Sequence, residues 1–402
     1  MANTTITSVK GFRAAAIHCG IKKNGKPDLA ALVSDVPATA AAVFTTNKVV
    51  GAPILVGREH IKSGILRACI INSGCSNVCT GKRGVDDAFE MCEISAATLG
   101  ESNLTRILPS STGVIGRFLP MDKIRAGIPQ VIAALSNSEE AGHAFSHGIL
   151  TTDLVPKTAR ETVTINGKKV TIAGCCKGSG MIAPNMATML AFVATDAAID
   201  RTALRTVMSD VTNGTFNCVT VDQHTSTSDT FALLANGLAG NKTIRSGGDL
   251  NKFAQALYNV CDSLAQQIAR DGEGATKLVT VLVTGAANDS DAKKGAEAIA
   301  NSALCKTAIH GGDPNWGRFV SAAGYSGAAM NVEKSACKVG KITVFKNGRP
   351  TDIDLKGVEH AMKQKDVLIT VDLGMKKPGA VYRVYTCDLS REYIAINADY
   401  TT

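Results

Sequence analysis

Thr188 is the residue of this sequence that is best placed for covalent chemistry. It stands between a loop containing glycine and proline, residues 177–184, and an apolar strand-like segment, residues 189–192, and the small residue Ala187 precedes it. A hydroxyl becomes a good nucleophile only when a base removes its proton, and a threonine at a chain terminus can use its own α-amine as that base. Two interpretations follow: the bond between Ala187 and Thr188 is cut to free that amine, or Thr188 merely opens a buried strand.

A second stretch suited to chemistry follows a short apolar strand at residues 107–109. There Thr112 and Gly113 lie in the run SSTGVIG. Glycine permits a backbone conformation that points N–H groups outward, and such groups stabilise the oxyanion of an acyl-transfer reaction. Turns of serine, threonine and glycine are also frequent structural elements, so the run by itself predicts either a plain turn or an oxyanion hole.

Two charged residues in loops are candidates for substrate contacts. Lys177 opens the loop before Thr188, and a lysine suits a substrate carboxylate. Glu273 lies in the tight loop DGEGA. A loop glutamate is usually solvated, so this position alone favours an ordinary surface residue.

Histidine and cysteine do not predict a metal centre. His143 and His147 are four residues apart in a helical region, but no third ligand is predicted nearby. The twelve cysteines include an adjacent pair, Cys175 and Cys176, and no CxxC pair. We therefore expect no metal, and reduced structural thiols rather than a zinc site or a disulfide framework.

The composition excludes several classes of protein. Hydrophobic residues make up 45% and charged residues 19% of the 402 residues, which is typical of a soluble globular protein. The net charge is +8, but aromatic residues amount to only 4% and the lysines lie in predicted turns, which argues against nucleic-acid binding. No apolar run reaches the roughly 18 residues that span a bilayer, and the first residues lack a signal-peptide core. We expect a cytoplasmic protein without membrane contact, and a small anionic substrate would suit its charge.

Alternating strand and helix signals predict a layered α/β protein, whose elements must position these residues. Asn166 and Gly167, between two segments of alternating character, predict a β-hairpin that leads the chain to Lys177. Apolar residues at helical spacing predict helices over 85–99 and 249–270.

A small and polar stretch, residues 285–295, marks a boundary between two parts of the chain. We place the boundary near residue 290. The predicted domains are a main α/β domain, 1–290, which contains Thr188, and a C-terminal α/β lobe, 291–402.

The run KGSGMIAPNMATMLAF, residues 177–192, resembles the self-cleavage signature of the ornithine acetyltransferase family, also called the bifunctional arginine-biosynthesis glutamate N-acetyltransferases. Nearly the whole chain is similar to that family, in the segments AVFTTN, FN at residues 216–217, DGEGA, HGGDPNWGR at residues 310–318 and the C-terminal residues. The resemblance implies helix layers that enclose packed β-sheets, with a smaller C-terminal α/β lobe.

The resemblance also implies a reaction. The bond between Ala187 and Thr188 would be cut autocatalytically, giving mature chains 1–187 and 188–402 that assemble as a heterotetramer with two copies of each. Thr188, as the new N-terminus, would carry the acetyl group from N-acetylornithine to glutamate. The resemblance implies no cofactor, and acetyl-CoA is a candidate second donor.

The site residues follow from the resemblance by matching motifs. Thr112 and Gly113 would form the oxyanion hole. Two places depart from the family pattern, because Cys75-Ser76 stands where the family has Asn-Ala, and His224 stands where it has a second aspartate. The distance from Lys177 in the family favours Thr151 over its neighbour as a substrate contact. The residues that would bind substrate are Thr151 or Thr152, Lys177, Thr188, Glu273, Asn397 and Thr402.

Two rival functions use the same sequence features differently. A related N-terminal-nucleophile amidohydrolase or aminopeptidase would pass the acyl group to water, since fold alone does not fix function. A non-catalytic binding protein would stay uncleaved. Fragment length on a denaturing gel separates the last from the others, and acetyl acceptance by glutamate separates the transferase from the hydrolase.

Overall fold

The computed structural model describes residues 4–183 and 189–399. These form two compact units. The first unit contains the chain up to Asn217 and the stretch His224–Leu264, and the second contains Cys218–Gln223 and the chain from Ala265 onward. The predicted boundary near residue 290 therefore falls inside the second unit, because the strand β9 (Leu278–Ala286) pairs with strands that lie further along the chain.

The first unit is built on one eight-stranded sheet in the order β4-β3-β2-β8-β7-β6-β5, with β1 paired to β2. The long strand β2 pairs with β3 on one side and, beyond a break in register between Val33 and Ala38, with β8 on the other. The bounds are β1 (Phe12–Ile17), β2 (Leu29–Phe44), β3 (Ile65–Cys75), β4 (Ile107–Val114), β5 (Lys157–Ile165), β6 (Lys168–Lys177), β7 (Leu190–Thr195) and β8 (Thr230–Ala235).

The two ends of this sheet share one apolar core. That core joins residues of β1–β4, such as Leu32 and Ile71, to residues of β6–β8, such as Phe192 and Leu234, and it includes Phe145 of α4. The opposite faces of β1, β2 and β3 pack on α2 and α3 in a second core. The helices are α1 (Ala52–His60), α2 (Gly81–Leu99), α3 (Met121–Ala133), α4 (Glu139–Gly148), α5 (Arg201–Gly214) and α6 (Gly247–Arg270).

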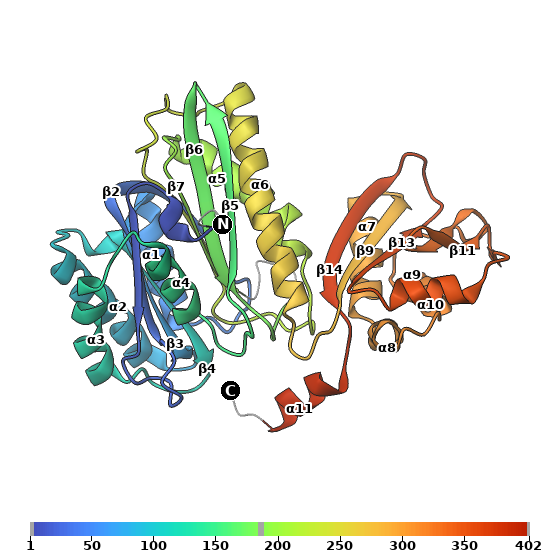
Figure 1. The fold of residues 1–402 in the computed structure, drawn as a ribbon, viewed down its shortest axis with the longest axis horizontal. Coiled ribbons are helices and arrows are strands. Elements are labelled where there is room, and N and C mark those ends of the chain that lie inside the picture. The colour runs from blue at the N-terminus through green and yellow to red at the C-terminus, as the bar shows by residue number, and fades with distance from the viewer. Residues whose placement is uncertain (1–3, 184–188, 400–402) are drawn as a thin grey trace. The chain divides into compact units, whose positions relative to one another are not determined.

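Helices therefore cover the outer faces of the packed sheet. Figure 1 shows α2 and α3 on the outer side of β2–β4 and α6 alongside β5 and β6. The contact of α6 with β6 includes the Cys176 thiol, whose Sγ lies 3.9 Å from the carbonyl oxygen of Leu264. The predicted fold class, helix layers enclosing packed β-sheets, is confirmed.

The hairpin that carries Lys177 forms as its sequence predicts. Strands β5 and β6 are antiparallel, with Ile165 opposite Lys168. Asn166 and Gly167 have φ values of 51° and 72°, the left-handed conformation that a two-residue turn between twisted strands requires. The helices predicted over 85–99 and 249–270 are also present, as parts of α2 and α6.

The second unit is a smaller α/β lobe around a six-stranded sheet in the order β12-β11-β10-β13-β9-β14. Its core joins alternate residues of β9 and β13 to α7, α8, α9 and α10. The strands are β9, β10 (Ala336–Val339), β11 (Ile342–Lys346), β12 (Arg349–Pro350), β13 (Asp366–Asp372) and β14 (Ala380–Cys387), and the helices are α7 (Asp289–Asn301), α8 (Ala303–Gly311), α9 (Gly317–Tyr325), α10 (Leu355–Met362) and α11 (Arg391–Asp399).

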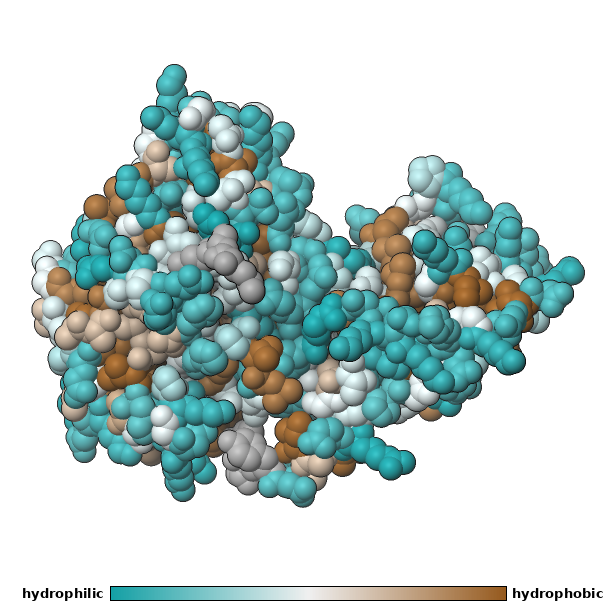
Figure 2. All heavy atoms as spheres, viewed as in Figure 1, coloured by the Kyte–Doolittle hydropathy of each residue, from teal (hydrophilic) through white to brown (hydrophobic). Residues whose placement is uncertain are grey.

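The surfaces of the two units are mainly hydrophilic on the side shown in Figure 2. Among the residues that the structure describes, no helix combines the length and the apolar sequence needed to cross a membrane.

Short 3-10 helices occur at η1 (Ile6–Ser8), η2 (Ile61–Ser63), η3 (Leu104–Arg106), η4 (Phe216–Cys218) and η5 (Val332–Lys334).

Candidate active site

Thr112 and Gly113 lie in the last residues of β4, paired with its parallel neighbour β3, and not in a turn after the strand. Gly113 is opposite Gly74 in register and has a φ of 128°. A Cβ at position 113 would lie 2.4 Å from the carbonyl carbon of Gly74, closer than any side chain tolerates. Thr112 is buried. The structure thus explains why glycine stands here, while the oxyanion role of the pair stays a prediction.

Asp153 ties the predicted substrate contacts of the first unit together. Its Oδ2 accepts a hydrogen bond from the backbone N–H of Thr151 at 3.1 Å. Its Oδ1 accepts one from the backbone N–H of Gly178 at 2.6 Å and one from the Lys157 ammonium at 2.8 Å. Since Gly178 directly follows Lys177, one buried carboxylate fixes both the 151–152 turn and the start of the 177–184 loop.

The charge of Asp153 depends on its lysine neighbours. Burial alone would raise the pKa of this carboxyl group, but the positive charges of Lys177 and Lys157, with hydrogen bonds from Lys157 and Gly178, hold the pKa below its ordinary value. Asp153 is therefore ionised at neutral pH. Lys157 is its direct partner, with both side chains fully buried.

Lys177 offers a cation to a ligand. The residue is buried, and no hydrogen bond joins its ammonium group to another residue that the structure describes. The negative charge of Asp153 interacts with the positive charge of Lys177. Two residues along the chain, the Ser179 hydroxyl lies 2.8 Å from that of Thr152. A buried ammonium group without a hydrogen-bond partner is suited to bind a carboxylate, because a buried charge gains most from such a partner.

Lys22 is a site residue that the sequence analysis missed. Its stem packs against Gly74, where a Cβ would lie 3.2 Å from Lys22 Cγ, and its ammonium donates a hydrogen bond to the Pro27 carbonyl at 2.7 Å. Burial lowers its pKa to about 8, and the charges of Asp153 and Lys177 also act on it. The sequence placed this lysine in an ordinary turn, and no local pattern distinguishes it from exposed Lys23.

Asp229 is a second residue that sequence reasoning passed over. It is buried immediately before β8, and the following residue, Thr230, donates its N–H to the carbonyl of Met189 at 2.9 Å. Asp229 Oδ2 has no hydrogen-bond partner among the described residues. Burial raises the pKa of this carboxyl group well above its ordinary value, despite hydrogen bonds from Ser226 and others and the charge of Lys177. Burial thus favours the protonated form of a carboxyl group that lies beside Met189, the residue that follows Thr188 in the sequence.

The second unit brings together Glu273 and Asn397. The Asn397 side-chain amide donates a hydrogen bond to Glu273 Oε2 at 2.9 Å and another to the Tyr393 carbonyl at 2.9 Å. Glu273 is buried in its loop rather than solvated. The two residues that the resemblance pairs as substrate contacts are therefore neighbours within this unit.

Three predicted site residues, Ala187, Thr188 and Thr402, lie outside the described residues. Both departures from the family pattern are described. Cys75 is buried with its thiol 3.4 Å from the Arg117 carbonyl, and the adjacent serine hydroxyl donates to the Val114 carbonyl at 2.7 Å. This pair therefore fastens the end of β3 to the last residue of β4 and to the chain that follows it. His224 is exposed.

No metal site accompanies these residues: within 4–183 and 189–399, no group of three or more histidine, cysteine or acidic side chains could hold a metal ion.

Helix layers around packed sheets define a layered α/β protein, and its first unit contains Gly113 at the end of β4, the buried Lys177 and the buried carboxyl group of Asp229. The chain belongs to the ArgJ family, whose model matches residues 13–402. The resemblance found in the sequence is thereby confirmed.

The relatives are similar along almost their whole length. The arginine biosynthesis bifunctional protein ArgJ of Halalkalibacterium halodurans is 47% identical over 99% of this chain and 96% of its own. The protein of the same name from Geobacter sulfurreducens is 46% identical over 98% of this chain and 100% of its own. Among solved structures, an ornithine acetyltransferase from Mycobacterium tuberculosis complexed with ornithine is 39% identical, covering 46% of this chain and 97% of that one, with a TM-score of 0.43.

Proposed function

We propose that this chain is a glutamate N-acetyltransferase of arginine biosynthesis that moves the acetyl group of N-acetylornithine to glutamate. The observation that carries the proposal is family membership over residues 13–402, together with relatives 44–47% identical that are named bifunctional arginine biosynthesis proteins. The geometry agrees with an amino-acid substrate, because a buried ammonium at Lys177 suits the carboxylate that both substrates carry.

The chemistry runs through an acetyl ester of Thr188. The Thr188 hydroxyl oxygen attacks the acetyl carbonyl while its own freed α-amine takes the hydroxyl proton. The tetrahedral intermediate collapses, the C–N bond breaks, and the same proton goes to the departing ornithine nitrogen. The glutamate amine then attacks the ester, loses a proton to the α-amine and leaves as N-acetylglutamate, while the proton returns to the Thr188 oxygen.

The other residues of the proposal bind and stabilise. Thr112 and Gly113 donate hydrogen bonds to the oxyanion of each tetrahedral intermediate. Lys177 binds the substrate carboxylate with the help of Thr151 or Thr152. Glu273, Asn397 and Thr402 keep the substrate-binding roles that the family resemblance gives them, and Glu273 suits the ammonium group of ornithine.

Maturation and assembly belong to the same proposal. The bond between Ala187 and Thr188 is cut by the protein itself, and the chains 1–187 and 188–402 assemble as a heterotetramer in the cytoplasm. No cofactor takes part. Acetyl-CoA acts as a second acetyl donor, in keeping with the word bifunctional in the relatives' names.

Intact mass spectrometry tests the proposal directly. Purified protein should contain a fragment beginning with Thr188, and N-acetylornithine alone should add one acetyl group to that fragment. Glutamate should then remove it as N-acetylglutamate. Release of free acetate instead of N-acetylglutamate would support the rival amidohydrolase, and a full-length protein that is active would overturn the N-terminal nucleophile.

A further inference from the structure

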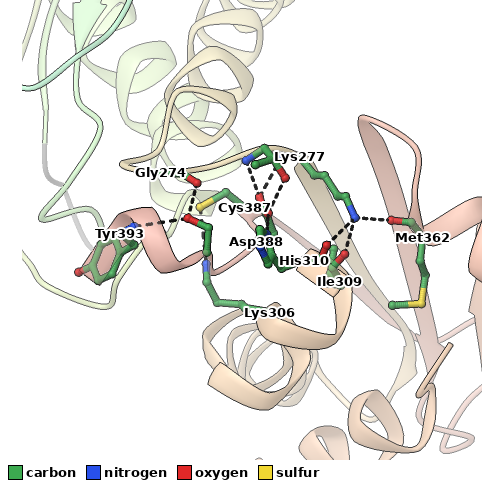
Figure 3. A network of polar contacts seen from close by, with 11 residues as sticks. Gly274, Lys277, Lys306, Ile309, His310, Met362, Cys387, Asp388 and Tyr393 are labelled. Atoms are coloured by element: carbon green, nitrogen blue, oxygen red, sulfur yellow. Dashed lines mark hydrogen bonds and ion pairs between the residues drawn. The ribbon is translucent and has the colours of Figure 1, made fainter. Parts of the chain in front are cut away.

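The HGGDPNWGR block, residues 310–318, has no role in the proposed reaction. Its first residue, His310, is nevertheless held by hydrogen bonds to both its side chain and its backbone. His310 lies in the last turn of α8. Its Nδ1 is 2.7 Å from Oδ2 of Asp388, which follows β14. Figure 3 shows the imidazole directed at this carboxylate. The contact joins two segments of the second unit that are far apart in the sequence.

Asp388 is a buried hub of hydrogen bonds. Its side chain is fully buried, and it accepts bonds from Thr276 N at 2.8 Å, Thr276 Oγ1 at 2.6 Å and Lys277 N at 2.9 Å, in addition to His310. Burial alone would raise its pKa, but the hydrogen bonds from Thr276, His310 and Lys277 lower it. Because the carboxylate is ionised and can only accept, His310 Nδ1 carries the hydrogen of this bond.

Lys277 closes the network into a ring. Its backbone N–H donates to Asp388, and its ammonium donates to the carbonyl oxygens of Ile309, His310 and Met362. These three acceptors match the three donors of an ammonium group. The ring of His310, Asp388 and Lys277, visible in Figure 3, therefore fixes both the side chain and the backbone of His310.

The same network anchors the loop that carries Glu273. Directly after Glu273, the Gly274 carbonyl accepts a hydrogen bond from Ser390 Oγ at 2.6 Å, and Ser390 Oγ accepts one from Tyr393 N at 3.3 Å. Gly274 has a φ of 68°, and a Cβ there would lie 2.5 Å from Tyr393 N. The loop is thus held at Gly274 by Ser390, which precedes α11, and at Thr276 by Asp388.

We propose that His310 is a positioning residue for substrate binding: through Asp388 it sets the loop 271–276 and so orients the Glu273 carboxylate. The inference rests on the substrate-binding role that the proposed function gives Glu273. The imidazole acts through Asp388 and does not contact the substrate. It supplies one of the donors that keep Asp388 ionised and in place, and Asp388 in turn holds the backbone of Thr276 and Lys277, where the loop that carries Glu273 ends.

A pair of substitutions at His310 tests the inference. His310→Ala removes the donor to Asp388, whereas His310→Asn keeps an N–H donor at nearly the position of Nδ1. We expect His310→Ala to raise the KM for N-acetylornithine roughly tenfold, the loss typical of one hydrogen bond to a charged group, with kcat changed by less than about threefold. His310→Asn should restore most of the affinity. His360→Ala, at an exposed histidine of the same unit, serves as the control and should change neither constant.

Hydrogen exchange provides a readout that does not depend on activity. His310→Ala should speed exchange of the amides of Thr276 and Lys277, which Asp388 protects, and His310→Asn should not. A wild-type KM in His310→Ala overturns the inference, whatever the exchange shows. If the wild-type protein transfers no acetyl group, the proposed function fails, and unchanged exchange in His310→Ala would then overturn the positioning role separately.

A second pair covers the case in which His310→Ala does not fold. Thr276→Val removes only the hydroxyl bond to Asp388 Oδ2, and Thr276→Ser keeps it. The valine variant should show the raised KM and the faster exchange, and the serine variant should show neither. Equal KM values for the two variants would overturn the role of Asp388 in holding the loop.

Discussion

At the scale of single residues, burial is the property that distinguishes the site from the surface. Lys22 and Lys23 are adjacent in sequence and identical in type, but only Lys22 is half-buried, against Gly74 at the end of β3. Desolvation disfavours the charged form of a lysine, so its titration moves towards neutral pH. A cation that titrates near the working pH links substrate binding to pH.

Lys22 should therefore control how the KM for N-acetylornithine depends on pH. Its pKa is lowered to about 8, mainly by burial, with Lys26 and Lys177 lowering it further and Asp28 and Asp153 opposing them. The protonated form predominates below pH 8 and is lost above it, so the wild-type KM should rise between pH 7 and pH 9, by roughly threefold to tenfold for one nearby charge.

Steady-state kinetics across this pH range checks the Lys22 prediction. Lys22→Met should show the high KM at pH 7 already and little further change, and Lys22→Arg should keep the low KM to pH 9 because arginine stays protonated. Lys23→Met is the matched control. A wild-type KM in Lys22→Met at pH 7 would contradict the role.

Asp229 should make folding stability fall as pH rises. Its pKa is raised in the folded state, so the folded protein keeps a proton that the unfolded chain has lost. The stabilisation is complete below the unfolded pKa of about 3.9 and decreases as pH rises from there towards the folded pKa, by at most about 1.4 kcal/mol per pH unit.

Urea unfolding of Asp229→Asn from pH 5 to pH 8 measures this contribution. The amide resembles the neutral acid and does not titrate, so the variant should lose less stability than the wild type over the range. Parallel stability curves for the two proteins would show that Asp229 is ionised in the folded state.

At the scale of elements, local signals predicted local structure and failed where distant segments meet. The Asn166-Gly167 turn could be predicted because the backbone conformation of a two-residue hairpin depends on those two residues alone. The site around Asp153 could not, since it gathers Lys22, the 151–153 turn and the end of β6, which only the pairing of the strands brings together. Asp229 was hidden for the same reason: nothing in a polar run shows that one carboxyl group will be buried.

The end of β4 gives a prediction at this scale. Gly113→Ala places a methyl group 2.4 Å from the Gly74 carbonyl carbon, so the two parallel strands must separate at the proposed oxyanion hole. We expect a fall in kcat on the order of 10²–10³, as for loss of one oxyanion donor. Gly116→Ala is the matched control, because Gly116 also has positive φ but nothing lies within 4 Å of its Cβ position.

Thermal unfolding of both glycine variants separates a loss of stability from a disruption of the proposed oxyanion hole. Each alanine carries the strain of a left-handed backbone, about 1–2 kcal/mol, so both should be somewhat destabilised. Only Gly113→Ala should lose activity. Equal kcat values in the two variants would show that the end of β4 takes no part in the mechanism.

At the scale of the whole molecule, the proposed cut at Thr188 passes between two neighbouring strands of one sheet. Strands β1–β6 precede the cut and β7 and β8 follow it, yet β8 pairs with β2 and β7 pairs with β6. The second fragment thus supplies two inner strands of a sheet whose other strands belong to the first. Their side chains, such as Phe192 and Leu234, are part of the core that both ends of the sheet share.

Cleavage should therefore leave the fragments 1–187 and 188–402 as one folded body. Without β7 and β8, the first fragment would expose the hydrogen-bonding edges of both β2 and β6 together with the apolar core between them, a state that favours aggregation. We expect the mature protein to elute in size-exclusion chromatography at the same volume as uncleaved Thr188→Ala, and its fragments to separate only in denaturant. Fragment 1–187 expressed alone should be insoluble, and co-expression with 188–402 should restore soluble protein. A soluble 1–187 with a native circular dichroism spectrum would contradict this dependence of one fragment on the other.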